Sequence, residues 1–148
     1  MHEADRQTLA MNGRTLYIIR GVPGTGKTTL AHILAGTSQA AADDFMVGSS
    51  GQYEFDPAKL PEAHEKCFEK ILYFLKAGTT KVAVHNTFTT KREMAPYIKA
   101  GEEHGYVVQI LTCETSHGSI HGVPDSTIQR MRDRFEPIEY YVPQGVKA

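Results

Sequence analysis

The order of apolar and helical segments predicts an α/β domain, in which a doubly wound, mostly parallel sheet of four to five strands has helices on both faces. Short apolar runs alternate with segments of helical periodicity, the pattern typical of right-handed crossovers between parallel strands. The clearest run, residues 16–19, is continuously apolar, as in strands that a sheet buries on both faces. The 148 residues suit one domain with one core. We divide them into a polar lead-in (1–13), the domain (14–136) and a tail (137–148).

Composition and charge limit the class of function. With 41% apolar and 22% charged residues, the chain has an ordinary globular mixture rather than a disordered one. Its net charge of -1 argues against coating long nucleic acid, which needs many Lys and Arg contacts, but leaves room for binding one nucleic-acid end. No apolar run approaches the ~20 residues of a membrane span, and the N-terminus lacks a signal-peptide pattern. We therefore expect a cytoplasmic protein without a membrane partner.

The elements follow one another in a regular order. Residues 14–20 form the first expected strand, and a glycine-rich turn leads into a helix over residues 27–34 that Gly36 ends. A short second strand, residues 39–42, precedes a loop over residues 46–55.

The clearest helical pattern follows this loop. Asp56 can cap the helix, Pro57 fits its first turn, and Gly78 ends it. Its stripe at three- and four-residue spacing comprises Leu60, His64, Cys67, Phe68, Ile71, Leu72 and Leu75. We then expect a strand at 82–84, a helix from 89 or 90 to 104, a strand at 106–111, a loop at 114–124 and a helix at 125–135. An interior proline costs about 3 kcal/mol, so Pro96 predicts a kink or two short segments.

The glycine-rich turn fits a phosphate-binding loop. Gly21, Gly26, Lys27 and Thr28 satisfy G-x-x-x-x-G-K-[ST] between a strand and a helix. Such a turn points successive N–H groups at a phosphate, aided by the helix N-terminus. Lys27 would neutralise the β- and γ-phosphates, and the Thr28 hydroxyl would hold Mg²⁺. The residues expected to hold the nucleotide are Gly21, Val22, Pro23, Gly24, Thr25, Gly26, Lys27, Thr28 and Thr29.

Other segments narrow the class of nucleotide-binding protein. The chain has no guanine-reading Asn-Lys-x-Asp, and its third strand lacks the acidic end typical of a motor ATPase. A small kinase remains, and it needs a carboxylate to orient and deprotonate the attacking hydroxyl. Asp43 and Asp44 stand at the end of the second expected strand, where a catalytic base and a plain turn fit the dipeptide equally well.

The order of the motifs resembles one family. GVPGTGKTT is followed by ADDF, by GQYEFDP, by a strand ending in Asn86-Thr87, and by IHGVP and IQRMRDRFE. This order resembles the polynucleotide 5′-hydroxyl kinase-like P-loop kinases, a family of phage end-healing kinases and related small AAA or zeta-toxin-like ATP-binding proteins. The resemblance covers residues 15–136, and ADDF, YEF-D-P and IHGVP are its more specific parts.

The resemblance implies an ATP- and Mg²⁺-dependent P-loop phosphotransferase that phosphorylates the 5′-hydroxyl of DNA or RNA. It implies that Asp43 is the general base, assisted by Lys27 and by Arg130, although Arg130 could instead be a solvated helix charge. The acceptor is expected to meet Asp44, Tyr53, His64, Asn86, Thr87, His117 and His121, and the metal to meet Thr28 and Asp44. A base can stack on an aromatic ring such as Tyr53, but Tyr53 and Phe55 could equally cover the core.

Three features depart from the family pattern. His85 stands where an Asp usually orders the Mg²⁺ shell, and neutral imidazole is a poor Mg²⁺ ligand. Met46 replaces an Arg that holds the accepting phosphate. Residues 101–128 contain no Lys or Arg, whereas the lid of such kinases carries arginines, so His117 and His121 remain there as donors to phosphate.

Two other functions stay open. A kinase for a small metabolite or nucleoside would use the same loop and Asp pair. A non-catalytic nucleotide-binding module would tolerate both His85 and a lid without arginine. The sequence favours neither DNA nor RNA, and it leaves the oligomeric state open.

Overall fold

The centre of the molecule is a four-stranded parallel sheet, and the computed structural model describes residues 13–114 and 125–136 around it. The strands are β1 (Thr15–Arg20), β2 (Gln39–Ala40), β3 (Lys81–Asn86) and β4 (Val107–Thr112), in the order β2-β3-β1-β4. In this register Ile18 of β1 lies between Val84 and Ile110. The predicted α/β fold class is confirmed.

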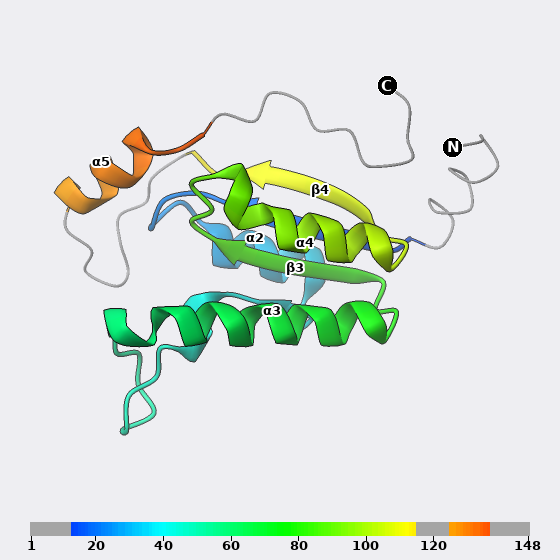
Figure 1. The fold of residues 1–148 in the computed structure, drawn as a ribbon, viewed down its shortest axis with the longest axis horizontal. Coiled ribbons are helices and arrows are strands. Elements are labelled where there is room, and N and C mark those ends of the chain that lie inside the picture. Colours follow the sequence, from blue (N-terminus) through cyan, green and yellow to red (C-terminus); the bar gives the residue numbers. More distant parts are fainter. Residues whose placement is uncertain (1–12, 115–124, 137–148) are drawn as a thin grey trace.

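Helices cover both faces of the sheet (Figure 1). They are α2 (Lys27–Ala35), α3 (Leu60–Lys76), α4 (Lys91–Glu103) and α5 (Asp125–Asp133). The larger core lies between the sheet and the helices α3 and α4, whereas α2 packs on the other face around Ile19, Ala31 and Ala83. Helix α5 covers neither face and lies beyond the edge where β3 and β4 end (Figure 1).

Helix α3 presents one buried stripe to the core. Ala63, Cys67, Ile71 and Leu75 recur every four residues and are at most 2% exposed. Burying a side chain the size of Leu or Ile contributes about 1.5–3 kcal/mol, so this stripe fixes the helix on the sheet. His64 was expected on the same stripe, and this was wrong: it lies one position beyond Ala63 and is exposed.

The segment after β2 differs from the sequence expectation. The strand ends two residues early, and a 3-10 helix, η1 (Ala42–Phe45), follows it. The N–H of Ala41 donates to Asp44 Oδ2 at 2.9 Å, and the N–H of Ala42 donates to Asn86 Oδ1 at 2.8 Å. Because side chains take these two donors, the strand ladder stops and the acidic pair lies on a tight turn.

A second 3-10 helix, η2 (Pro57–Lys59), leads into α3. Asp56 was expected to cap the long helix, but it caps η2 instead: its Oδ1 accepts from the N–H of Ala58 at 3.0 Å, and α3 begins after Lys59 without a side-chain cap.

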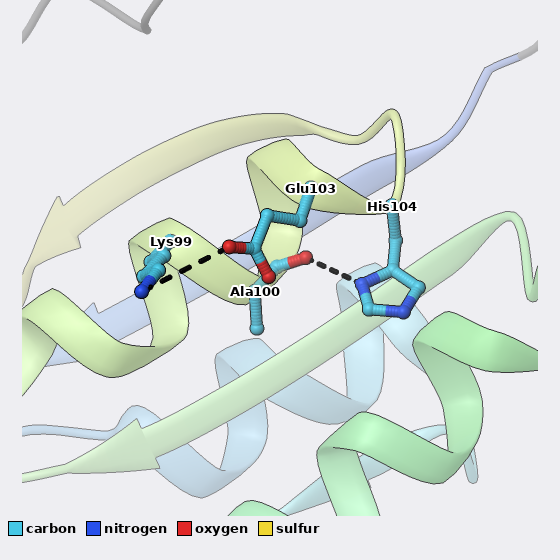
Figure 2. A network of polar contacts seen from close by, with 4 residues as sticks. All are labelled: Lys99, Ala100, Glu103 and His104. Carbon is cyan, nitrogen blue, oxygen red and sulfur yellow. Dashed lines mark hydrogen bonds and ion pairs between the residues drawn. The ribbon is translucent and has the colours of Figure 1, made fainter.

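Helix α4 is continuous through Pro96, which rules out two short segments, one of the two outcomes expected at this proline; a kink was the other. Pro96 and Arg92 are both exposed, and the carbonyl group that loses its partner can therefore bind water. Figure 2 shows the last turn, where His104 Nδ1 lies 2.8 Å from the carbonyl oxygen of Ala100. None of the helices within residues 13–114 and 125–136 has the length and apolarity needed to cross a lipid bilayer.

Candidate active site

The turn between β1 and α2 has the backbone of a phosphate-binding loop. Gly24 and Gly26 have φ angles of 85° and 84°, a region that glycine adopts without steric cost. Gly21 has no room for a side chain, since a Cβ would lie 2.6 Å from Thr25 Oγ1 and 2.7 Å from the carbonyl oxygen of Cys113. Because the glycines have no side chains, an anion can approach the main chain closely and bind the N–H groups at the start of α2.

Lys27 lies against this loop. Its Nζ donates to the carbonyl oxygen of Val22 at 3.0 Å, and the same oxygen accepts from Thr25 Oγ1 at 2.8 Å. Burial lowers the pKa of Lys27, and Cys113 and Asp43 oppose this shift. The ammonium group is thus held beside the loop by a neutral acceptor, and phosphate oxygens would be stronger acceptors for it.

The two carboxylates of η1 are both exposed. Asp44 accepts through Oδ2 from the N–H of Ala41 in its own turn, as described above. The charge of Asp43 opposes the lowering of the Lys27 pKa, and burial, with a smaller contribution from Asp43, raises the pKa of Tyr53. The Asp43 carboxylate therefore lies within electrostatic reach of the loop lysine.

Asn86 and Thr87 lie at the end of β3 and connect the two parts of the site. Asn86 is only 8% exposed; its Oδ1 accepts from the N–H of Ala42, and its Nδ2 lies 3.8 Å from Cys67 Sγ. The carbonyl oxygen of Thr87 accepts from the N–H of Gly21 at 3.2 Å. Asn86 holds the turn that carries the acidic pair, and Thr87 holds the start of the glycine loop.

His85 is a buried, neutral member of the β2–β3 interface. Its Nε2 donates to Gln39 Oε1 at 2.6 Å, and Gln39 Nε2 lies 3.3 Å from His32 Nε2. Burial lowers the pKa of His85 to about 4, Asp44 opposes the shift, and Lys27 and His32 add to it. An imidazole that donates from Nε2 to an amide oxygen joins two strands, a different task from that of a magnesium ligand.

We expect the free energy of unfolding to fall in acid because of His85. A histidine with a pKa of about 4 when folded and 6.5 when unfolded contributes its stability fully above pH 6.5 and loses it as the pH falls toward 4. The loss would reach roughly 3 kcal/mol. Denaturant unfolding at about pH 7, 5.5 and 4.5 measures it. His85→Gln is the control, since glutamine can donate to Gln39 without titrating; equal acid sensitivity in both proteins would contradict the assignment.

The loop after η1 carries exposed aromatic side chains. Tyr53 forms an isolated antiparallel bridge with Val47 and is 39% exposed, and Phe55 is 56% exposed. Neither ring covers the core, the alternative that the sequence left open. His64 is exposed on the first turns of α3, so the structure leaves its side chain available at the surface.

Helix α5 carries the predicted arginine. Arg130 is exposed, and its Nη2 donates to Thr127 Oγ1 at 3.2 Å. An open pocket of about 480 Å³ on this helix is lined by Thr127, Arg130, Asp133 and Arg134. Two arginines thus face one pocket. His117 and His121 lie outside the described residues.

Arg20 is a functional candidate that sequence reasoning missed. It is the last residue of β1, is only 1% exposed and lies directly before the glycine loop. Fully buried charged side chains are rare unless they are paired. A charged residue at the end of a continuously apolar strand is the signal that could have indicated it.

A parallel sheet with a glycine loop between β1 and α2 defines a P-loop nucleotide-binding domain. A family model described as an AAA domain matches residues 16–122, and the chain belongs to this family.

Several proteins of known identity are similar to this chain. Human NEDD4-binding protein 2 (Homo sapiens) is 29% identical in an alignment of 145 residues, and the match covers 88% of this chain and 8% of that protein. Mouse 2′,3′-cyclic-nucleotide 3′-phosphodiesterase (Mus musculus) is 22% identical in an alignment of 108 residues, and the match covers 70% of this chain and 24% of that protein. The chain therefore spans less than a quarter of the length of these relatives.

Solved structures share the fold. A chain in the structure of the Pnkp1/Rnl/Hen1 RNA repair complex matches with a TM-score of 0.54 and 20% identity, over 88% of this chain and 40% of that one. A second structure of the Pnkp1/Rnl/Hen1 complex matches with a TM-score of 0.54 and 17% identity, over 90% of this chain and 43% of that one.

Proposed function

We propose that this domain is an ATP- and Mg²⁺-dependent kinase that transfers the γ-phosphate to a 5′-hydroxyl end of DNA or RNA. The observation that carries the proposal is that two segments meet at the end of β3, where Thr87 holds the start of the glycine loop and Asn86 holds the turn that carries Asp43. Phosphoryl transfer to a hydroxyl needs a cation on the phosphates and a carboxylate for the departing proton. The similarity to a cyclic-nucleotide phosphodiesterase agrees with a nucleotide or nucleic-acid substrate.

The residues divide the reaction between them. The main-chain N–H groups of residues 21–28 and the Lys27 ammonium bind the β- and γ-phosphates of ATP. As the acceptor oxygen attacks the γ-phosphorus, Asp43 takes the hydroxyl proton and ADP leaves with the electrons of the broken P–O bond. Arg130 would neutralise charge on the moving phosphoryl group.

The site also fits a magnesium ion. The Thr28 hydroxyl is exposed on the first turn of α2, and Asp44 uses Oδ2 for its own turn, which leaves Oδ1 for a metal-bound water. Hydroxyl, carboxylate and phosphate oxygens with several waters suit Mg²⁺. When bound, the ion would neutralise charge on the β- and γ-phosphates. Among the described residues, no group of three or more His, Cys, Asp or Glu side chains could hold a metal alone, so the phosphates would complete the ligand shell.

The acceptor would lie along the loop that follows Asp43. Val47 and Tyr53 pair across an isolated antiparallel bridge, the N–H of Glu54 donates to the carbonyl oxygen of Met46, and the exposed Phe55 follows directly. Stacking of a base on an exposed aromatic ring contributes about 1–3 kcal/mol. Other acceptor contacts proposed around this loop are those of Asp44, His64, Asn86 and Thr87.

The proposal is tested by transfer of labelled γ-phosphate from ATP with Mg²⁺. The acceptors are DNA and RNA oligonucleotides with a 5′-hydroxyl, the same oligonucleotides with a 5′-phosphate as the matched control, and free nucleosides. Label on the hydroxyl-ended oligonucleotides alone supports the proposal.

The second candidate is a kinase for a nucleoside or other small molecule. It is favoured by the lack of Lys and Arg in residues 101–128, where a nucleic-acid backbone would need cations. Label on the nucleosides alone would establish it. Tight nucleotide binding without transfer to any acceptor would contradict both and indicate a binding module.

A further inference from the structure

Arg20 is a buried cation at the carboxyl end of β1, directly before the glycine loop. Its Nε donates to the carbonyl oxygen of Phe88 at 3.0 Å, and its Nη2 donates to the carbonyl oxygen of Thr89 at 3.3 Å. Phe88 has a positive φ of 48° and is 3% exposed. A non-glycine residue holds such a strained backbone only where its surroundings determine it, and the guanidinium bond to its carbonyl is one such constraint.

The other side of the guanidinium meets the segment that follows α5. Its Cζ lies 3.9 Å from the centre of the Phe135 ring, which is a cation–π contact. The next residue, Glu136, donates its N–H to the carbonyl oxygen of Thr89 at 2.7 Å. The Thr89 carbonyl therefore accepts from β1 and from the end of α5 at the same time.

Two carboxylates balance the buried charge. Glu93 accepts from the N–H and the hydroxyl of Thr89 at 2.9 and 3.2 Å, and Glu136 accepts from the N–H of Lys91 at 3.1 Å. Burial lowers the pKa of Arg20, and Glu136 and Glu93 oppose this shift. An arginine with two carbonyl acceptors, an aromatic face and two nearby carboxylates remains charged.

Little else attaches α5 to the domain in the part of the chain that the structure describes. Ile128 is its one buried apolar residue there, at 8% exposure, and most of its other described side chains are exposed, as is Arg134 directly after it. The position of α5 at the sheet edge therefore depends strongly on the contact of Arg20 with Phe135 and on the bonds of Glu136 to Thr89 and Lys91.

We propose that Arg20 is a positioning residue that fastens the end of α5 to the strand preceding the nucleotide loop and so keeps Arg130 and Arg134 at the carboxyl edge of the sheet. The evidence for the attachment is the set of contacts described above. The expected effect on the rate of phosphoryl transfer rests on the proposed kinase function, in which an arginine on α5 neutralises charge in the transition state.

Phe135→Leu tests the attachment without touching the core, and Arg20→Lys keeps the charge but loses the flat, forked donor. Tyr73→Leu is the matched control, since Tyr73 is an aromatic residue that is 70% exposed on α3. In Phe135→Leu and Arg20→Lys, hydrogen exchange of the α5 amides should become about tenfold faster, which corresponds to about 1.4 kcal/mol of local opening. The exchange of β1 and β3 and the affinity for ATP should stay unchanged in Phe135→Leu, while kcat for transfer falls and the KM for ATP does not change.

The outcomes separate the two levels of the proposal. Unchanged α5 exchange in Phe135→Leu would overturn the attachment, whatever the activity. Faster α5 exchange with unchanged kcat would overturn the catalytic consequence. If the wild type transfers no phosphate, the proposed kinase function fails, and the exchange experiment alone still decides whether Arg20 fastens α5.

Discussion

Asp43→Asn is expected to lower the rate of phosphoryl transfer by about 10²–10⁴-fold, the usual contribution of a general base. Asparagine keeps the shape of the side chain but cannot accept the proton of the attacking hydroxyl. Asp43 is exposed, and removing its negative charge near Lys27 does not weaken the attraction of the loop for phosphates, so ATP should bind as tightly as before. Single-turnover transfer of labelled phosphate, with ATP affinity measured separately, gives both quantities.

The matched control is Asp56→Asn. It removes the same charge from the same loop region, and asparagine caps a helix about as well as aspartate, so the Ala58 contact survives. This variant should transfer phosphate at the wild-type rate. An Asp43→Asn protein as active as the control would contradict the assignment of the base.

Gly21→Ala is expected to weaken ATP binding at least about 100-fold, which corresponds to about 2.7 kcal/mol. The new Cβ would lie 2.7 Å from the carbonyl oxygen of Cys113 and 2.6 Å from Thr25 Oγ1, and a backbone oxygen cannot move aside as a flexible side chain can. The loop would have to shift, and its N–H groups would no longer converge on one phosphate. Calorimetric titration with a non-hydrolysable ATP analogue measures the affinity.

Gly36→Ala is the control for adding a methyl group to a glycine at an end of α2. Gly36 has a φ of 59° and a ψ of -122°, a backbone conformation that residues other than glycine rarely adopt. A Cβ added there would have no neighbouring atom within 4 Å, so alanine strains the backbone by about 1–3 kcal/mol without a steric clash. Stability should fall while ATP affinity stays unchanged. Equal affinity in the Gly21 and Gly36 variants would show that the crowding at Gly21 does not shape the anion site.

Features with a local pattern could be predicted from the sequence. The glycine loop is defined by nine consecutive residues, 21–29, because glycine conformations and the helix N-terminus that follows are local properties. The alternation of strands and helices and most of the α3 stripe follow from spacing in the same way. Asp43 could be singled out only together with the family resemblance, since two carboxylates after a strand also form an ordinary turn.

The tertiary structure decided what depends on distant partners. Asn86 holds the N–H of Ala42 across 44 positions, which shortens β2 and orients the acidic pair. Arg20 bonds to Phe88 across 68 positions and packs on Phe135, and His85 bonds to Gln39 across 46 positions. A local sequence pattern indicates which secondary structure a segment prefers. It does not indicate which distant group will bond to a buried donor or a buried charge. The roles of these residues therefore follow only from the three-dimensional structure.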